Sequence, residues 1–96
     1  MLFVVILTDR PGTAAIRQQW LAAHLEWLKQ QTAVRQAGSL RESPDANPVG
    51  GCWIVEALDS AAVSALIESD PFWVNGLRDT VRILQWSVVF PERLQA

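Results

Sequence analysis

The stretch MLFVVILTDRPG at residues 1–12 opens with a run of apolar residues and closes in a turn. The run from Leu2 to Thr8 is rich in residues that favour β-strands, and DRPG is typical turn chemistry. Apolar and polar residues do not alternate along it, so both faces of the strand are apolar. We therefore expect a central strand that is covered on both sides.

The rest of the chain divides into short elements separated by turn sequences. The pattern predicts, in chain order, a helix over 13–32, strands over 34–42 and 52–57, a helix over 60–68, a turn or helical hook in DPFWVNG, a strand over 80–90 and the tail PERLQA. Thr13 and Asp59 are the expected N-caps of the two helices. The segment SPDANPVGG, with two prolines and two glycines, is expected to connect the second and third strands.

The predicted order is βαββαβ, with no internal repeat and no linker. This order indicates an α+β fold, namely a ferredoxin-like plait in which a four-stranded antiparallel sheet carries two helices on one face. We expect a single domain over residues 1–96. The second face of the sheet is also apolar, and a second copy of the chain is its simplest cover. The sequence thus predicts a homodimer that pairs through the open sheet face.

Composition excludes several classes of protein. Half of the 96 residues are hydrophobic, and the formal charge of −2 comes with basic residues that are spread singly, so we expect no nucleic-acid partner. The opening apolar run is too short for a signal or membrane segment, which favours a cytoplasmic protein without membrane association. The lone Cys52 excludes an internal disulfide and is expected to be a small core residue. No metal-ligand spacing or phosphate-binding glycine loop occurs, so no metal or cofactor is expected.

His24, the single histidine, lies in the apolar sequence WLAAHLEWL at residues 20–28. On a helical projection it falls in the seam between two apolar stripes, Ile16/Trp20/Ala23/Trp27 and Leu21/Leu25/Leu28. Arg17 lies in the same seam two helical turns earlier. Because unpaired polar groups are costly in a dry core, both side chains need partners or a water-filled cleft. Two interpretations stay open, a structural histidine hydrogen-bonded inside the core and a functional histidine facing a cleft.

Asp70, in the sequence SDPFW, is the second candidate. It is either an ordinary turn residue or the partner that holds the His24 ring. In a plait the two helices lie side by side, so the end of the second can approach the first. A nucleophilic set of Ser39, His24 and Asp70 is a further alternative, although Ser39 lacks the strand-turn-helix motif of such nucleophiles.

Several motifs together resemble the YciI-like (YCII-related) family. These are the opening MLFVVILTDRPG, an arginine two turns before HL, AGS on the second predicted strand, DPF after the second helix and the closing apolar strand. The resemblance covers nearly the whole chain and implies a dimeric α+β barrel, similar to muconolactone isomerase and antibiotic-monooxygenase-like proteins. The family's histidine–aspartate pair corresponds to His24 and Asp70, and its arginine to Arg17.

The resemblance also implies a function. One characterised branch of the family removes chloride from a chlorinated hydroxyquinol, which indicates lyase-like chemistry. We expect His24 and Asp70 to carry proton transfer on a small aromatic or enol-type substrate, in an elimination or isomerisation without a cofactor. Candidates for substrate binding are Arg17, Trp20, Ser39 and Phe72. Trp20 and Gly38-Ser39 depart from the family, which often has a basic residue and Gly-Pro there. The alternative is a non-catalytic small-ligand-binding or protein-interaction module.

Overall fold

A computed structural model describes residues 1–91 of the chain. Its elements, in chain order, are β1 (Leu2–Asp9), α1 (Ala14–Gln30), β2 (Val34–Leu40), β3 (Gly50–Glu56), α2 (Ser60–Glu68), α3 (Pro71–Val74) and β4 (Arg78–Trp86). None of these helices is both long and apolar enough to cross a membrane.

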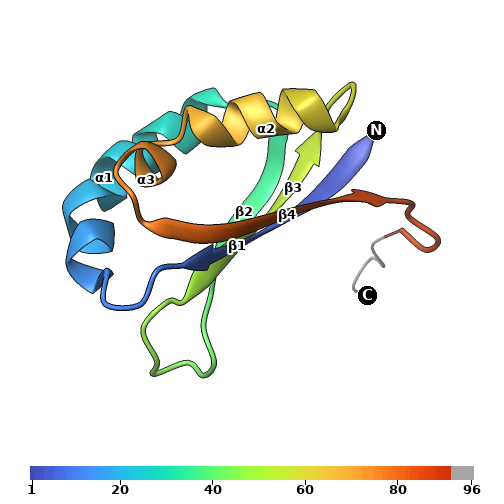
Figure 1. The fold of residues 1–96 in the computed structure, drawn as a ribbon. Coiled ribbons are helices and arrows are strands. Elements are labelled where there is room, and N and C mark those ends of the chain that lie inside the picture. The colour runs from blue at the N-terminus through green and yellow to red at the C-terminus, as the bar shows by residue number, and fades with distance from the viewer. Residues whose placement is uncertain (92–96) are drawn as a thin grey trace.

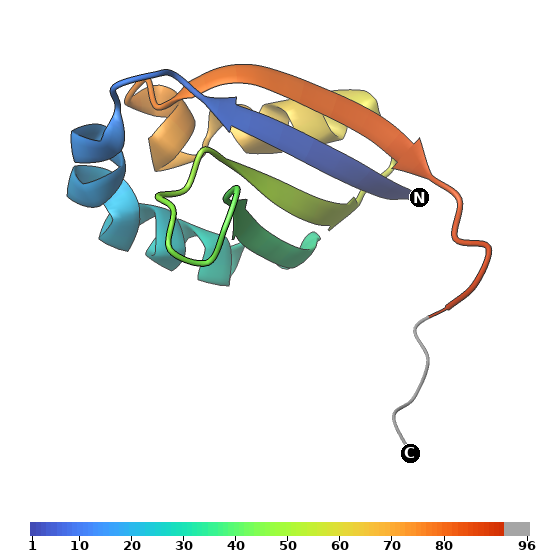
Figure 2. The same cartoon turned by 90° about the horizontal axis from the view of Figure 1, so that it is seen from below.

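The strands form one sheet in the order β2-β3-β1-β4, and each neighbouring pair is antiparallel. β1 lies between β3 and β4, so the prediction of a central strand at Leu2–Thr8 is confirmed. The helices lie on one side of the sheet (Figure 1), and the view from the other side shows the strands in front of them (Figure 2). The predicted ferredoxin-like plait is therefore the observed fold.

The hydrophobic core lies between the sheet and the helices. Its buried members are Phe3, Val5, Leu7, Trp53, Val55, Val63 and Ile67. Burying each of the larger side chains stabilises the fold by about 1.5–3 kcal/mol. α1 adds little to this cluster, since His24 is its one buried residue while Leu21 and Leu25 are exposed. This arrangement leaves room for a cleft between α1 and the β2 side of the sheet.

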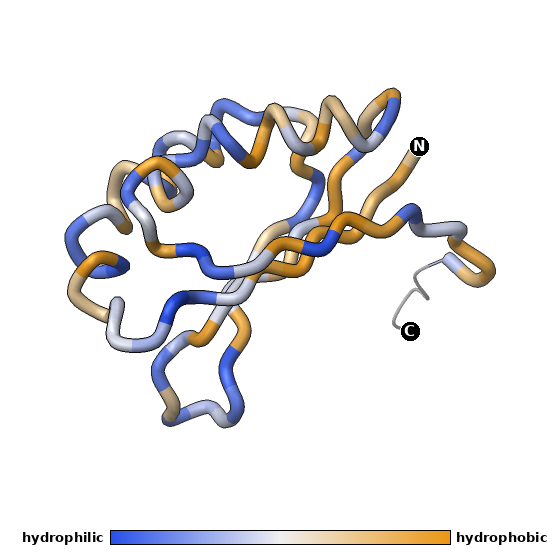
Figure 3. The backbone as a smooth tube through the Cα atoms, viewed as in Figure 1, coloured by the Kyte–Doolittle hydropathy of each residue, from blue (hydrophilic) through white to orange (hydrophobic). Residues whose placement is uncertain are grey.

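The opposite face of the sheet carries an apolar strip, and no helix within residues 1–91 covers it (Figure 1). Leu2 of β1 pairs with Glu56 and Trp86, Val4 pairs with Ile54 and Leu84, and Ile6 pairs with Cys52 and Arg82. The apolar strip is therefore bordered by one acidic and one basic residue. Leu84 and Trp86 are 42% and 44% exposed. Figure 3 shows the hydrophobic colour along the central strands. Cys52 is half-buried on this face, so its expected place in the core is wrong.

Pairing with β1 sets the ends of the neighbouring strands. β3 begins at Gly50 and β4 at Arg78, two residues before their predicted starts, because Thr8 pairs with Gly50 and Asp9 with Arg78. β4 ends at Trp86 because its partner Leu2 is the first residue of β1, so the predicted extension to residue 90 is wrong. Of the predicted tail PERLQA, residues 92–96 lie outside the described range.

The two predicted helix caps have different outcomes. Asp59 accepts a hydrogen bond from the backbone N–H of Ala62 at 2.9 Å, which confirms it as the N-cap of α2. Thr13 occupies the N-cap position of α1, but its hydroxyl donates to the carbonyl oxygen of Arg10 at 2.5 Å. Thr13 therefore supports the preceding turn and leaves the helix without a side-chain cap.

Candidate active site

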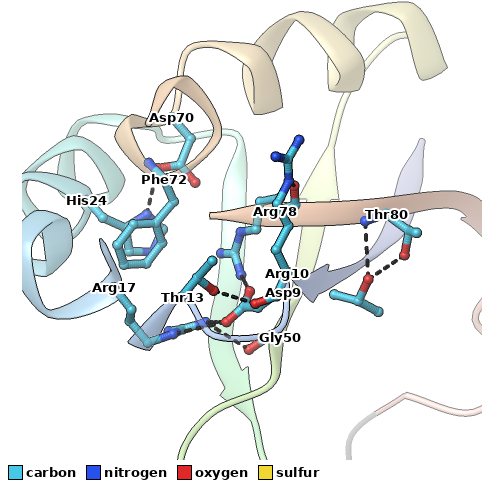
Figure 4. Close-up of polar contacts among 11 residues, drawn as sticks. Asp9, Arg10, Thr13, Arg17, His24, Gly50, Asp70, Phe72, Arg78 and Thr80 are labelled. Carbon is cyan, nitrogen blue, oxygen red and sulfur yellow. Dashed lines mark hydrogen bonds and ion pairs between the residues drawn. The ribbon is translucent and has the colours of Figure 1, made fainter. Parts of the chain in front are cut away.

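His24 points from α1 toward the start of α3. Its Nδ1 atom lies 2.7 Å from Oδ1 of Asp70, and both side chains are buried. Figure 4 shows the His24 and Phe72 rings overlapping beside the Asp70 carboxylate. The structure thus brings together two candidates that are far apart in the sequence, through the packing of α3 against α1.

Asp70 is held in place by the helix that it precedes. It is the N-cap of α3, where Oδ1 accepts a hydrogen bond from the backbone N–H of Phe72 at 3.0 Å. Pro71 follows as the first helical residue, where its missing N–H costs nothing. Asp70 is only 1% exposed, and its Oδ2 has no hydrogen-bond partner within residues 1–91. The DPF sequence therefore builds a rigid buried carboxylate.

This carboxylate orients the histidine ring. An ionised carboxylate can only accept hydrogen bonds, so Nδ1 of His24 carries the hydrogen, and Nε2 of the neutral ring has a free lone pair. No hydrogen bond joins Nε2 to any residue in the described range. His24 also lines a cleft, which gives the ring the arrangement that a general base needs.

Aromatic side chains fix the plane of the ring. Phe72 stacks on His24 with ring centroids 4.0 Å apart and an interplanar angle of 14°. The rings of Trp27 and Trp53 lie farther away, at 6.3 and 6.4 Å. Phe72 is fully buried, so its contribution is to hold the imidazole rather than to form the cleft wall.

Arg17, Asp9 and Arg78 form an ion-paired triad beside the histidine (Figure 4). Oδ2 of Asp9 accepts from Nη2 of Arg17 at 2.7 Å and from its Nε at 3.1 Å. Oδ1 of Asp9 accepts from Nη1 of Arg78, also at 2.7 Å. Sequence reasoning missed Asp9 and Arg78. The signal that could have found them was a charged residue at the end of β1 and another at the start of β4. The strand register that brings these two residues together was not known from the sequence.

A cleft of about 240 Å³ opens between α1 and the β2–β3 side of the sheet. Its lining residues are Arg17, Leu21, His24, Leu25, Leu28, Ala37, Gly38, Ser39, Arg41, Pro48, Gly50, Gly51, Trp53 and Arg78. The three leucines are the second apolar stripe of the helical projection, so this stripe faces the cleft. A larger groove of about 770 Å³ beside the β1–α1 turn shares Arg17, Leu21 and Pro48 with the cleft.

The other candidates for substrate binding lie at different distances from this cleft. Arg17 and Ser39 line it, and the hydroxyl of Ser39 accepts a hydrogen bond from Arg41 at 3.2 Å. Trp20 is half-buried and does not line it. Within residues 1–91, no three His, Cys, Asp or Glu side chains are grouped so that they could hold a metal ion.

Residues 1–87 match the sequence family described as the YCII-related domain. The chain belongs to this family. Its fold resembles a 5-chloro-2-hydroxyhydroquinone dehydrochlorinase from Burkholderia phenoliruptrix AC1100, solved in complex with 2,5-dihydroxybenzoquinone. That protein is 29% identical to this YCII-related chain, with a TM-score of 0.82 over 91% of this chain and 94% of the other.

More distant structures share the plait of this YCII-related chain. An antibiotic biosynthesis monooxygenase is 18% identical, with a TM-score of 0.55 over 92% of this chain and 100% of the other. A cofactor-independent oxygenase from Streptomyces nogalater is 16% identical, with a TM-score of 0.55 over 95% and 96%. At these identities the likeness concerns the fold alone. No curated protein sequence matches the chain.

Proposed function

We propose that this protein is an enzyme in which His24 and Asp70 transfer a proton on a small aromatic or enol-type substrate. The observation that carries the proposal is the short contact between Nδ1 of His24 and Asp70, which leaves Nε2 as the basic nitrogen beside a cleft. The reaction class is elimination or isomerisation, and it needs no metal or organic cofactor.

In this mechanism Nε2 of His24 removes a proton from a hydroxyl or an acidic carbon of the substrate. A hydroxyl keeps the electron pair on its own oxygen as a phenolate, whereas the pair from an acidic carbon moves onto a conjugated oxygen, which becomes enolate-like. In an elimination the negative charge flows back from the oxygen, a new double bond forms as the leaving group departs with its bonding electron pair, and the imidazolium releases its proton to solvent. In an isomerisation the imidazolium returns the proton to another carbon. Asp70 stabilises the imidazolium, and Arg17 balances the charge on the oxygen.

The size of the cleft supports a substrate of one ring. A cavity of about 150 Å³ is enough to hold benzene in a protein interior, and this cleft has about 240 Å³. Leucines and Trp53 supply apolar walls, while Arg17, Ser39 and His24 supply polar contacts. The similarity to a dehydrochlorinase that was solved with a dihydroxybenzoquinone favours hydroxylated rings as substrates.

We further propose that two copies of the chain pair through the open sheet face. Leu84 and Trp86 are exposed there beside the apolar side chains of β1 and β3, and such contiguous apolar surface is usual at interfaces. A location in the cytoplasm stays a prediction from the sequence.

The test is turnover of hydroxylated aromatic rings, beginning with 5-chloro-2-hydroxyhydroquinone and chloride release. We expect His24→Ala to lower kcat/KM by roughly a hundredfold or more, the usual contribution of general acid–base catalysis. Chloride release that is unchanged in the variant would remove His24 from the mechanism.

Binding distinguishes the enzyme from a non-catalytic module. Calorimetry with 2,5-dihydroxybenzoquinone should show binding to both the wild-type protein and His24→Ala, because leucines, Trp53 and Arg17 remain. A chain that binds this ligand but turns over none of the tested rings would instead be a ligand-binding module.

A further inference from the structure

Arg78 is a buried arginine that the proton-transfer mechanism does not use. It is the first residue of β4 and only 5% exposed, yet it lines the cleft together with His24. Its guanidinium carbon lies 5.2 Å from the centroid of the Phe72 ring, the ring that stacks on His24. A Cβ atom on Gly51 would lie 3.4 Å from Nη2 of Arg78, so the glycine leaves space for the guanidinium.

The charges around this guanidinium do not cancel. Asp9 contacts both Arg17 and Arg78, so one carboxylate serves two cations. Asp70, the other buried carboxylate nearby, is engaged with His24. The residues that line the cleft include Arg17, Arg41 and Arg78 but no aspartate or glutamate. The cleft therefore carries a net positive charge.

Most donors of Arg78 are also unused. A guanidinium has five N–H donors, and the single hydrogen bond that it donates within residues 1–91 is the one from Nη1 to Asp9. Its Nε is buried without a partner. Burial lowers the pKa of Arg78 from its ordinary value, against the opposing effect of Asp9, because water is removed from the cation. A buried cation with free donors is stabilised by a further anion.

We propose that Arg78, with Arg17, forms an anion subsite that binds a negatively charged oxygen of a ring-sized ligand. This proposal deepens the proposed function, on which it rests for the cleft as the ligand site, by making the substrate an anionic ring compound. The charged oxygen is a phenolate or a carboxylate, both of which accept hydrogen bonds from a guanidinium. Asp9 is a positioning residue that holds both arginines.

Calorimetry with benzoate and benzamide tests the subsite, because the two probes share size and shape but differ in charge. The wild-type protein should bind benzoate at least tenfold more tightly than benzamide, as expected for a charge-assisted hydrogen bond. Arg78→Met should abolish this preference and change benzamide affinity less than twofold. Arg35→Met is the matched control, since it removes the same charge from exposed β2 outside the cleft.

A second probe distinguishes the source of the charge. Bound 4-nitrophenol should ionise at a lower pH than the free compound if the subsite accepts a phenolate, and the absorbance of nitrophenolate reports this directly. A preference for benzoate without that change assigns the site to carboxylates. If neither probe shows a preference for the anion, or if Arg78→Met retains it, the proposal is overturned.

One measurement needs no substitution, in case Arg78→Met fails to fold. In the wild-type protein the NMR signal of the Arg78 Nε–H group should shift with benzoate and stay unchanged with benzamide. An unchanged signal in both titrations contradicts the subsite. His24→Gln should keep the preference for benzoate over benzamide. Failure of the proton-transfer proposal would therefore appear in turnover, and failure of the anion subsite would appear in benzoate binding.

Discussion

Nδ1 of His24 lies 2.7 Å from Oδ1 of Asp70, although 46 positions separate the two residues in the chain. The same carboxylate oxygen caps α3 by accepting from Phe72 N–H. One atom therefore links the start of a short helix to the orientation of the histidine. The stability of α3 and the state of the proposed base are coupled through this contact.

Asp70→Ala should lower the free energy of unfolding by about 2–4 kcal/mol, since it removes a helix cap and leaves a buried histidine unpaired. Asp59→Ala, which removes only the cap of α2, should cost about 1 kcal/mol. Urea unfolding measures both values. The ¹⁵N chemical shifts of the His24 ring should change in Asp70→Ala but not in Asp59→Ala. Equal losses of unfolding free energy in the two variants, with unchanged ring shifts in both, would contradict the coupling.

Phe72→Leu should loosen the histidine ring, because it removes the aromatic face that stacks on it. We expect Phe72→Leu to lower the free energy of unfolding by about 1–2 kcal/mol, less than truncation of Phe72 to alanine would. Phe3→Leu is the control, as Phe3 is a core phenylalanine of β1. The NMR chemical shifts of the His24 ring protons should differ from wild type in Phe72→Leu and stay at their wild-type values in Phe3→Leu. The opposite pattern would show that Phe72 does not position the ring.

Gly50 and Gly51 are adjacent but should respond differently to alanine. A Cβ on Gly50 would lie 2.1 Å from the carbonyl oxygen of Leu7, which is backbone and cannot move away. We expect Gly50→Ala to cost roughly 4 kcal/mol or more.

At Gly51 the nearest atoms are the Gly38 carbonyl oxygen at 3.3 Å and Nη2 of Arg78 at 3.4 Å. We expect Gly51→Ala to lower the free energy of unfolding by about 1 kcal/mol. Thermal unfolding ranks the two glycine variants, and a more severe effect at Gly51 would disagree with this geometry.

Leu84→Asp should separate the proposed dimer, because it places a charge within the apolar sheet face. Light scattering coupled to gel filtration should then report half the wild-type mass, with an unchanged circular dichroism spectrum. Leu58→Asp is the control, since Leu58 is 82% exposed and lies outside the sheet strands. A wild-type protein that already runs at the mass of one chain would refute pairing through this face.

Much of the architecture followed from the sequence, because it depends on local patterns. The doubly apolar run at Leu2–Thr8 identified the central strand, and the order of elements led to the plait. The helical projection placed His24 away from the solvated face of α1, and the structure shows that its side chain is buried. Strand ends were less accurate, since β4 stops where β1 has no further residue to pair with.

Tertiary structure alone decided which side chains meet. Asp9 and Arg78 face each other through the register of β1 and β4, and His24 reaches Asp70 because α3 packs against α1. These contacts join residues from distant parts of the chain, so no local pattern encodes them. They arise when burial of the core sets the relative positions of the elements. For this reason the sequence alone indicated His24 and Arg17 but not the Asp9–Arg78 pair beside them.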